Sequence, residues 1–183
     1  MDTVGGRYVL DGRLGEGGMG QVYRARHVQL GKAFALKVIS PAFAEDGAAR
    51  ARFNREAKLA SEITHPNIVS VVDFGEDHQL GAYMVMELVD GVPLLAEGGR
   101  LPVKRAIDIL AQVTDAVDHI HRCGIVHGDI KADNIMLTSE PGSTAAARRR
   151  RIVRLLDFGL ARRHDHADDE ALAGSPHYIA PER

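Results

Sequence analysis

The sequence predicts an α+β fold with two lobes, and three observations lead to this prediction. Five short runs rich in apolar and β-branched residues, with one helical segment among them, occupy the first half of the chain. A long amphipathic helix follows a connector that contains Gly and Pro. Short apolar runs and a charged C-terminal stretch come after that helix. We therefore expect one lobe over residues 1–89 and a second over residues 90–183.

The overall composition is that of a globular protein. The chain has 183 residues, of which 45% are hydrophobic and 26% charged, so it can bury a core. Its formal net charge of −2 gives no indication of a nucleic-acid or membrane partner. Cys123 is the only cysteine, which excludes an intrachain disulfide and favours a reducing, cytoplasmic compartment. No segment has the apolar length of a signal peptide or a membrane span.

In the first lobe, alternating and apolar runs predict strands that begin at Tyr8 and then cover 22–28, 34–39, 69–74 and 82–86. Residues 48–63 have helical periodicity. Phe53, Glu56, Ala60 and Ile63 fall on one stripe of that helix, so Glu56 faces inward. A buried carboxylate needs a partner, which makes Glu56 a candidate for an ion pair.

The second lobe begins after a connector at 89–93. Its long helix is predicted over 103–122, with Gly124 just past the end. Short strands are predicted at 135–137 and 152–156, around a polar insert at 139–151, and an extended charged loop from residue 157 to the end. We interpret the arginine-rich insert as a solvated surface loop, with docking of nucleic acid or phosphate as the alternative. The apolar stripe predicted on the long helix consists of Ala106, Leu110, Val113, Val117 and Ile120.

The loop from His127 to Asn134 places a carboxylate, an ammonium and a carboxamide within a few residues of one another. Asp129 could accept a hydroxyl proton, Lys131 could balance phosphate charge, and Asn134 could hold a magnesium ion. Asp157, in an Asp-Phe-Gly triplet, follows across a hairpin and could share that ion with Asn134.

Two further sequence patterns are typical of a nucleotide-binding site. Gly15-x-Gly17-x-x-Gly20 is followed by a strand rather than a helix, which favours a glycine-rich hairpin folded over phosphates instead of a dinucleotide fingerprint. A simple turn is the alternative. Lys37 could pair with Glu56 and bind phosphates, or it could be an ordinary surface lysine.

Taken together, and with His65-Pro66-Asn67 and Ala180-Pro181-Glu182 in the expected order, these segments resemble the eukaryotic-like Ser/Thr protein kinase family, in the style of its bacterial members. The resemblance implies a two-lobed protein-kinase-like fold, with a five-stranded antiparallel N-lobe and a partial helical C-lobe. It implies ATP and Mg²⁺ as cofactors and transfer of the γ-phosphoryl group to Ser/Thr of a protein substrate. It also leaves open a homodimer that forms through the N-lobe.

The resemblance also assigns roles position by position. Lys37, held by Glu56, orients the α- and β-phosphates. Asp129 is the catalytic base and Lys131 the γ-phosphate contact, while Asn134 and Asp157 are the metal ligands. The residues around the nucleotide are Leu14, Gly15, Gly17, Gly20, Val22, Ala35, Lys37, Met86, Glu87, Val89 and Met136.

The chain departs from the family pattern at Gly128, where many kinases carry an arginine that binds a phosphorylated loop. Residues 160–174 contain no Ser, Thr or Tyr that could carry a phosphate, so an arginine at position 128 would have no phosphate there to bind. We predict that activity does not depend on phosphorylation in that stretch. We interpret the acidic residues there, Asp165, Asp168, Asp169 and Glu170, as a solvated face.

The chain ends one residue after Ala180-Pro181-Glu182, and from this we expect a truncated kinase whose long helix exposes part of its apolar stripe. Two alternatives to a protein kinase stay open. One is a non-catalytic remnant that binds a nucleotide or a partner. The other is a phosphotransferase of the aminoglycoside or choline type, which His127-Gly128-Asp129 matches but Lys131, Asp-Phe-Gly and Ala-Pro-Glu disfavour.

Overall fold

The structure, a computed structural model, describes residues 3–17, 20–39, 46–97, 101–139, 151–157 and 162–163. It confirms the α+β class and contains two compact units. The first consists of Met1–Glu62 with Ser70–Leu88, and the second of Ile63–Val69 with Val89–Arg183. The segment Ile63–Val69 belongs to the second unit because its backbone bonds to the strand at 152–155, which the division at residue 89 did not anticipate.

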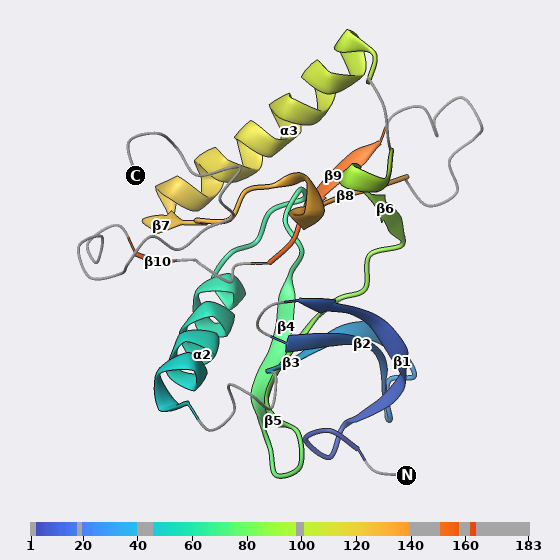
Figure 1. Cartoon of the computed structure of the whole chain (residues 1–183), viewed down its shortest axis with the longest axis vertical. Coiled ribbons are helices and arrows are strands. Elements are labelled where there is room, and N and C mark those ends of the chain that lie inside the picture. Colours follow the sequence, from blue (N-terminus) through green and yellow to red (C-terminus); the bar gives the residue numbers. More distant parts are fainter. Residues whose placement is uncertain are drawn as a thin grey trace. The chain divides into compact units, whose positions relative to one another are not determined.

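The first unit is built on five antiparallel strands, as predicted (Figure 1). They lie in the order β1-β2-β3-β5-β4. The predicted glycine hairpin is present, because β1 continues through the glycine cluster and pairs with β2 as far as Gly17 opposite Gly20. The strands are β1 Tyr8–Gly17, β2 Gly20–His27, β3 Ala33–Ile39, β4 Val71–Asp77 and β5 Gly81–Glu87.

Helix α2 (Gly47–Ser61) packs on one face of this sheet, beside β4 and β5 (Figure 1). It begins where the Asp46 side chain accepts hydrogen bonds from the backbone N–H groups of Ala48 and Ala49, at 2.9 and 3.3 Å. Phe53, Glu56 and Ala60 are buried, as the stripe predicted. Ile63 is buried too, but it lies beyond the end of the helix.

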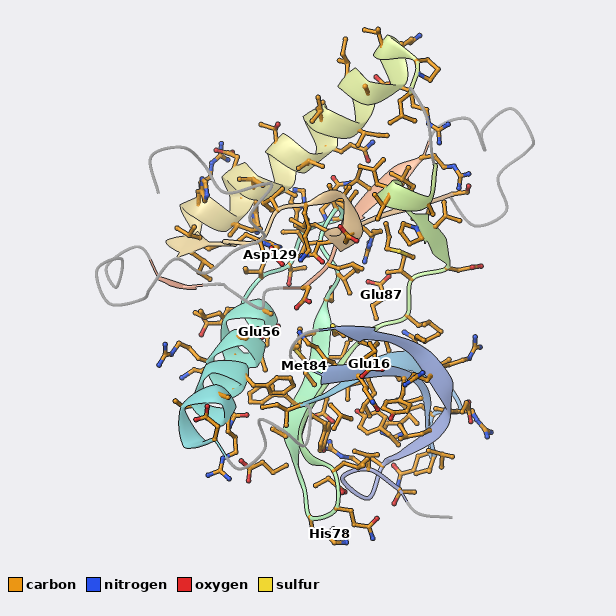
Figure 2. The ribbon with its side chains drawn as sticks, viewed as in Figure 1. Glu16, Glu56, His78, Met84, Glu87 and Asp129 are labelled. Atoms are coloured by element: carbon orange, nitrogen blue, oxygen red, sulfur yellow. The ribbon has the colours of Figure 1, made fainter. Side chains whose placement is uncertain are left out.

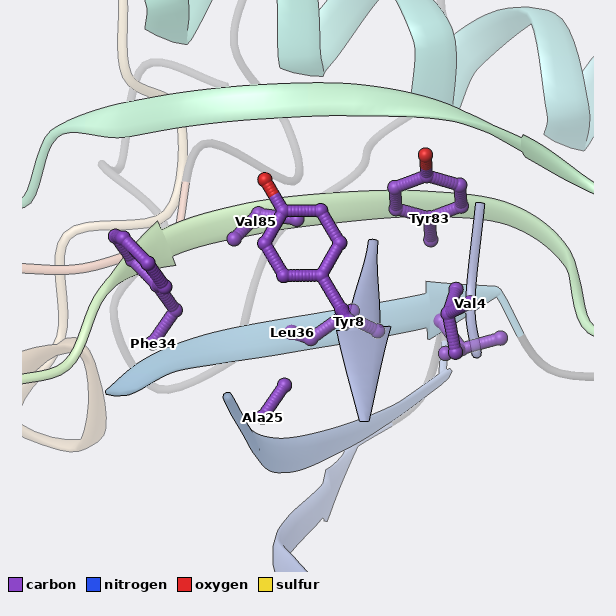
Figure 3. Close-up of a cluster of buried hydrophobic side chains, with 8 residues drawn as sticks. Val4, Tyr8, Ala25, Phe34, Leu36, Tyr83 and Val85 are labelled. Carbon is purple, nitrogen blue, oxygen red and sulfur yellow. The ribbon is translucent and has the colours of Figure 1, made fainter. Parts of the chain in front are cut away.

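The other face of the sheet carries a hydrophobic core in which Tyr8 is packed against Phe34 and Tyr83 (Figure 3). The Tyr8 hydroxyl donates a 2.8 Å hydrogen bond to Asp73, and burial together with this bond raises the pKa of Tyr8 to about 12. The whole cluster consists of Val4, Tyr8, Ala25, Phe34, Leu36, Val38, Tyr83 and Val85.

The second unit contains α3 (Val103–Arg122), whose bounds are those predicted. Its buried face differs from the predicted stripe: Val113 and Ile120 are buried, with Ile109 and Ala116, whereas Leu110 is 62% exposed. Leu110 is the exposed part of the predicted stripe, in agreement with the expectation that the stripe is only partly covered, whereas Ile109 and Ala116 are buried residues that the stripe did not contain. Among the described residues, no helix is long and apolar enough to cross a bilayer.

Short strands complete the second unit. Strands β6 (Gly91–Pro93), β8 (Ile135–Thr138) and β9 (Ile152–Leu155) form a sheet in the order β6-β8-β9. Strand β7 (Ile125–Val126) pairs with β10 (Arg162–Arg163), and 3₁₀ turns lie at η1 (Leu94–Glu97) and η2 (Ala132–Asn134). Strand β6 falls inside the predicted connector. Most of the polar insert, Phe158-Gly159 and Ala180-Pro181-Glu182 lie outside the described residues.

Candidate active site

The sheet of the first unit brings several predicted nucleotide-binding residues onto one face. Val22 lies opposite Lys37 across β2 and β3, and Ala35 lies opposite Met86 across β3 and β5. Side chains that are paired across strands point to the same face. Met84, the partner of Lys37 on β5, packs with the core of α2, so this is the face that α2 also covers.

The predicted ion pair between Lys37 and Glu56 is present. Lys37 Nζ lies 3.1 Å from Glu56 Oε1, and the two side chains are only 8% and 2% exposed. Figure 2 shows Glu56 on α2. A buried ammonium and carboxylate are costly unless they neutralise each other, so the pair fixes the position of the lysine on β3.

The glycines of the cluster occupy two different environments. A Cβ at Gly15 would meet nothing within 4 Å, so the space beside the hairpin is open at this position. A Cβ at Gly20 would lie 2.0 Å from the carbonyl oxygen of Val38. Gly20 is therefore required by the close approach of β2 to β3, whatever it does for a ligand. Leu14, next to Gly15, is half exposed.

In the second unit, the three loop residues predicted to act together do lie together. Lys131 Nζ is 2.8 Å from Asp129 Oδ2. Asn134 Nδ2 donates to the same oxygen at 3.0 Å and to the Asp129 carbonyl at 2.9 Å. Asp129 thus has a cation and an amide beside one carboxylate oxygen, both on a loop that η2 closes.

His127 belongs to the motif, but no role of its own could be assigned to it from the sequence. It is buried, its Nδ1 accepts the Asp129 N–H at 3.3 Å, and its Nε2 bonds the Leu156 carbonyl at 3.2 Å. Because a backbone N–H points at Nδ1, the proton belongs on Nε2, which donates to Leu156. Burial lowers the pKa of His127, so the ring is neutral and links Asp129 to the residue before Asp157.

The residues predicted to hold magnesium fit that ion. The Leu156 N–H donates to the Asn134 carbonyl at 2.8 Å, so the backbone of Asp157 starts beside Asn134. Both N–H groups of the Asn134 amide face Asp129, which turns its Oδ1 the other way. A carboxylate and an amide oxygen suit Mg²⁺, which takes its remaining ligands from phosphates and water. Among the described residues, no group of three or more His, Cys, Asp or Glu that could hold a metal ion is present.

The backbone at Asp157 is unusual. Among the described residues it is the single non-glycine residue with positive φ, at 58°. Asp and Asn tolerate this left-handed conformation better than other residues, and such conformations cluster at functional sites.

The remaining predicted residues lie at the end of β5, just after it, and on β8. Glu87 closes β5 and its N–H bonds to the Ser70 carbonyl at 3.0 Å. Val89 begins the main segment of the second unit, and Met136 lies on β8 opposite Pro93.

Comparison with known proteins agrees with this arrangement. Residues 8–183 match the model of the protein kinase domain. The chain belongs to the protein kinase family. It is 38% identical over 191 residues to the serine/threonine-protein kinase pkn3 of Myxococcus xanthus, and 38% identical to the serine/threonine-protein kinase PknA of Mycobacterium tuberculosis.

The match covers 99% of this chain, but 34% of pkn3 and 42% of PknA, so the chain spans less than half the length of these relatives. The crystal structure of the Mycobacterium tuberculosis PknI kinase domain is similar, with a TM-score of 0.71 and 34% identity. That likeness covers 86% of this chain and 61% of the PknI domain.

Proposed function

We propose that this chain transfers the γ-phosphoryl group of ATP to Ser/Thr hydroxyls of a protein substrate. The observation that carries the proposal is the loop of the second unit, where Lys131 and Asn134 both contact the Asp129 carboxylate. The Asn134 carbonyl also accepts the N–H of Leu156, the residue before Asp157. Bound Mg²⁺–ATP would supply the electrophilic phosphoryl group and neutralise its charge.

The residues of the chain have separate tasks in this proposal. Asp129 accepts the hydroxyl proton as the new P–O bond forms and the bond from the γ-phosphorus to ADP breaks, and Lys131 offsets phosphate charge next to it. Asn134 and Asp157 hold the metal. In the first unit, Lys37, fixed by Glu56, binds the α- and β-phosphates, while the glycine hairpin and the residues around Ala35 and Met86 bind the nucleotide.

The test is a transfer assay with labelled ATP, Mg²⁺ and a basic protein substrate. Asp129→Asn keeps the shape of the loop but removes the base, so transfer should fall by at least about 100-fold. Asp133→Asn is the matched control, because Asp133 is an exposed carboxylate of the same loop outside the proposed machinery. Equal transfer by both variants would contradict the proposal.

The same assay separates the alternative of a non-catalytic remnant. If the folded protein binds ATP but transfers no more phosphate than its Asp129→Asn variant does, it is a nucleotide-binding remnant. Transfer to an aminoglycoside or choline but not to protein would indicate a small-molecule phosphotransferase.

Location and assembly are part of the proposal. A cytoplasmic location is supported by the composition, with one cysteine that is exposed in the structure. Light scattering of the purified chain between low and high micromolar concentration tests a homodimer through the first unit. A mass that stays at 19.9 kDa would exclude it.

A further inference from the structure

The outer edge of β9 is paired by side chains along Arg151–Val153, and at Leu155 by the backbone of residues 67–69. Strand β9 lies at the edge of its sheet, with β8 on one side. On the other side Gln112, from the middle of α3, accepts the Val153 N–H at Oε1 (3.0 Å) and donates from Nε2 to the Arg151 carbonyl (3.1 Å). One carboxamide therefore makes the two bonds that a neighbouring strand would make.

The pairing continues along β9 through Asn67, which is buried. Its Nδ2 donates to the Val153 carbonyl at 2.9 Å and to Gln112 Oε1 at 3.0 Å. Its own carbonyl accepts the Leu155 N–H at 2.7 Å, and Val69 donates to the Leu155 carbonyl at 3.0 Å. The outer-edge groups from Arg151 to Leu155 are thus bonded in unbroken order.

The chemistry fixes the orientation of the Gln112 amide. Its oxygen meets two donors, Val153 N–H and Asn67 Nδ2, and its nitrogen meets the carbonyls of Arg151 and Asp108. The reverse orientation would oppose donor to donor and acceptor to acceptor. Every hydrogen-bonding position of the amide is used, so Glu or Leu could not replace it.

We propose that Gln112 is a positioning residue for metal binding: by pairing the edge of β9, it sets where Asp157, two residues beyond that strand, presents its carboxylate. Unpaired edge strands shift register easily, and Asp157 also requires a left-handed φ of 58°, so a small shift of β9 moves the metal ligand. The proposal rests on the proposed function, since it assumes that Asp157 binds the metal.

The experiment measures Mn²⁺ binding to the 183-residue chain saturated with a non-hydrolysable ATP analogue, by electron paramagnetic resonance. Gln112→Leu should weaken Mn²⁺ binding about 10-fold, as is usual when a group that supports a metal ligand is removed. Binding of the analogue without metal should change less than about twofold. Thr114→Ala, an exposed position of α3, is the control and should bind Mn²⁺ as the parent does. All samples are measured below their melting temperature, and Gln112→Glu, which keeps the side-chain volume, replaces Gln112→Leu if the latter does not fold.

Asp157→Asn separates the two possible failures. If Asp157→Asn weakens Mn²⁺ binding and neither Gln112 variant does, the positioning proposal is wrong and the proposed function stands. A loss of metal and nucleotide binding in equal proportion in the Gln112 variants would also overturn it, because the role would then be merely structural. If Asp157→Asn leaves Mn²⁺ binding unchanged, the metal role of Asp157 is wrong and both proposals fall.

Discussion

Gly20, the last glycine of the Gly15-x-Gly17-x-x-Gly20 motif, has a structural role that a phosphate-binding motif does not suggest. Its Cα lies so near β3 that a Cβ would be 2.0 Å from the Val38 carbonyl oxygen, and backbone at such a contact cannot simply move aside. We expect Gly20→Ala to lower the free energy of unfolding by about 1 to 3 kcal/mol, the usual cost of overpacking.

Gly15→Ala is the matched control for this change, because a Cβ there meets nothing within 4 Å. Urea denaturation should give Gly15→Ala a midpoint close to that of the parent, while its affinity for ATP tests the nucleotide role separately. Equal midpoints for the two variants would show that β2 and β3 can separate at no cost.

Gly128 replaces the arginine expected from the family, and the structure adds a reason for glycine. Its φ is +83°, in the left-handed region that disfavours residues with a Cβ. We expect Gly128→Arg and Gly128→Ala to destabilise the chain by a similar amount, about 1 to 2 kcal/mol, because the strain comes from the backbone and not from the charge. Thermal unfolding of both variants measures this. An arginine variant as stable as the parent, beside a destabilised alanine variant, would show instead that the guanidinium finds a partner.

At the scale of the elements, the Lys37–Glu56 pair joins β3 to α2. Breaking a buried pair leaves one charge uncompensated, so Lys37→Met or Glu56→Leu alone should cost about 3 to 5 kcal/mol. The double variant should recover much of this loss, since apolar side chains of similar volume fill the same space. The exposed pair Arg13–Glu16, with side chains 56% and 60% exposed, is the control, and Arg13→Ala should cost less than about 1 kcal/mol. Additive losses in the double variant, measured by denaturation, would mean that the two buried charges do not stabilise each other.

The elements also show what the sequence could and could not predict. The bounds of α3 follow from its periodicity, and the strands of the first unit follow from their alternation. The buried face of α3 does not, because Ile107 and Leu110 fit a helical stripe as well as Ile109 does, and only the packing partner decides between them. Strands as short as β6, β7 and β10 form because a neighbouring strand pairs with them. They contain too few residues to show the alternation of side chains that predicts a strand.

The candidate site divides in the same way. Asp129, Lys131 and Asn134 lie close in the sequence, so their contact could be predicted from spacing. Gln112 and Asn67 could not be linked to β9, because their partners are tens of residues away and a buried amide has no periodic signature. The pairing of Lys37 with Glu56 could be predicted, because the helical stripe indicated that the carboxylate faces inward.

At the scale of the whole molecule, the two units contain different acid-sensitive groups. In the second unit, His127 is neutral, its pKa is lowered by burial, and its Nδ1 accepts the Asp129 N–H. In the first unit, the pKa of Asp77 is lowered because its carboxylate accepts the backbone N–H of Gly5, with further bonds from Gln79 and Leu80. Each shift gives a pH range in which stability is lost.

The signs follow from proton linkage. The unfolded chain binds a proton at His127 more readily than the folded chain does. The contribution of neutral His127 to the free energy of unfolding is therefore fully present above the ordinary histidine pKa of 6.5 and decreases as the pH falls below it. For Asp77 stability is complete above the ordinary value of 3.8 and is lost as the pH falls through the lower folded pKa. The second unit should therefore loosen first on acidification.

Hydrogen exchange, corrected for intrinsic rates, measures this order through two amides. Protection of the Asp129 N–H, which needs an unprotonated Nδ1 on His127, should decrease below pH 6.5, whereas that of the Gly5 N–H should persist until below pH 3.8. Asp77→Asn should weaken Gly5 protection already at neutral pH and remove its response below pH 3.8, while leaving the response of Asp129 unchanged. If both amides of the parent lost protection together in a single step near pH 6, the two units would unfold as one cooperative body, and the loop around His127 would control the stability of the five-stranded sheet as well as its own.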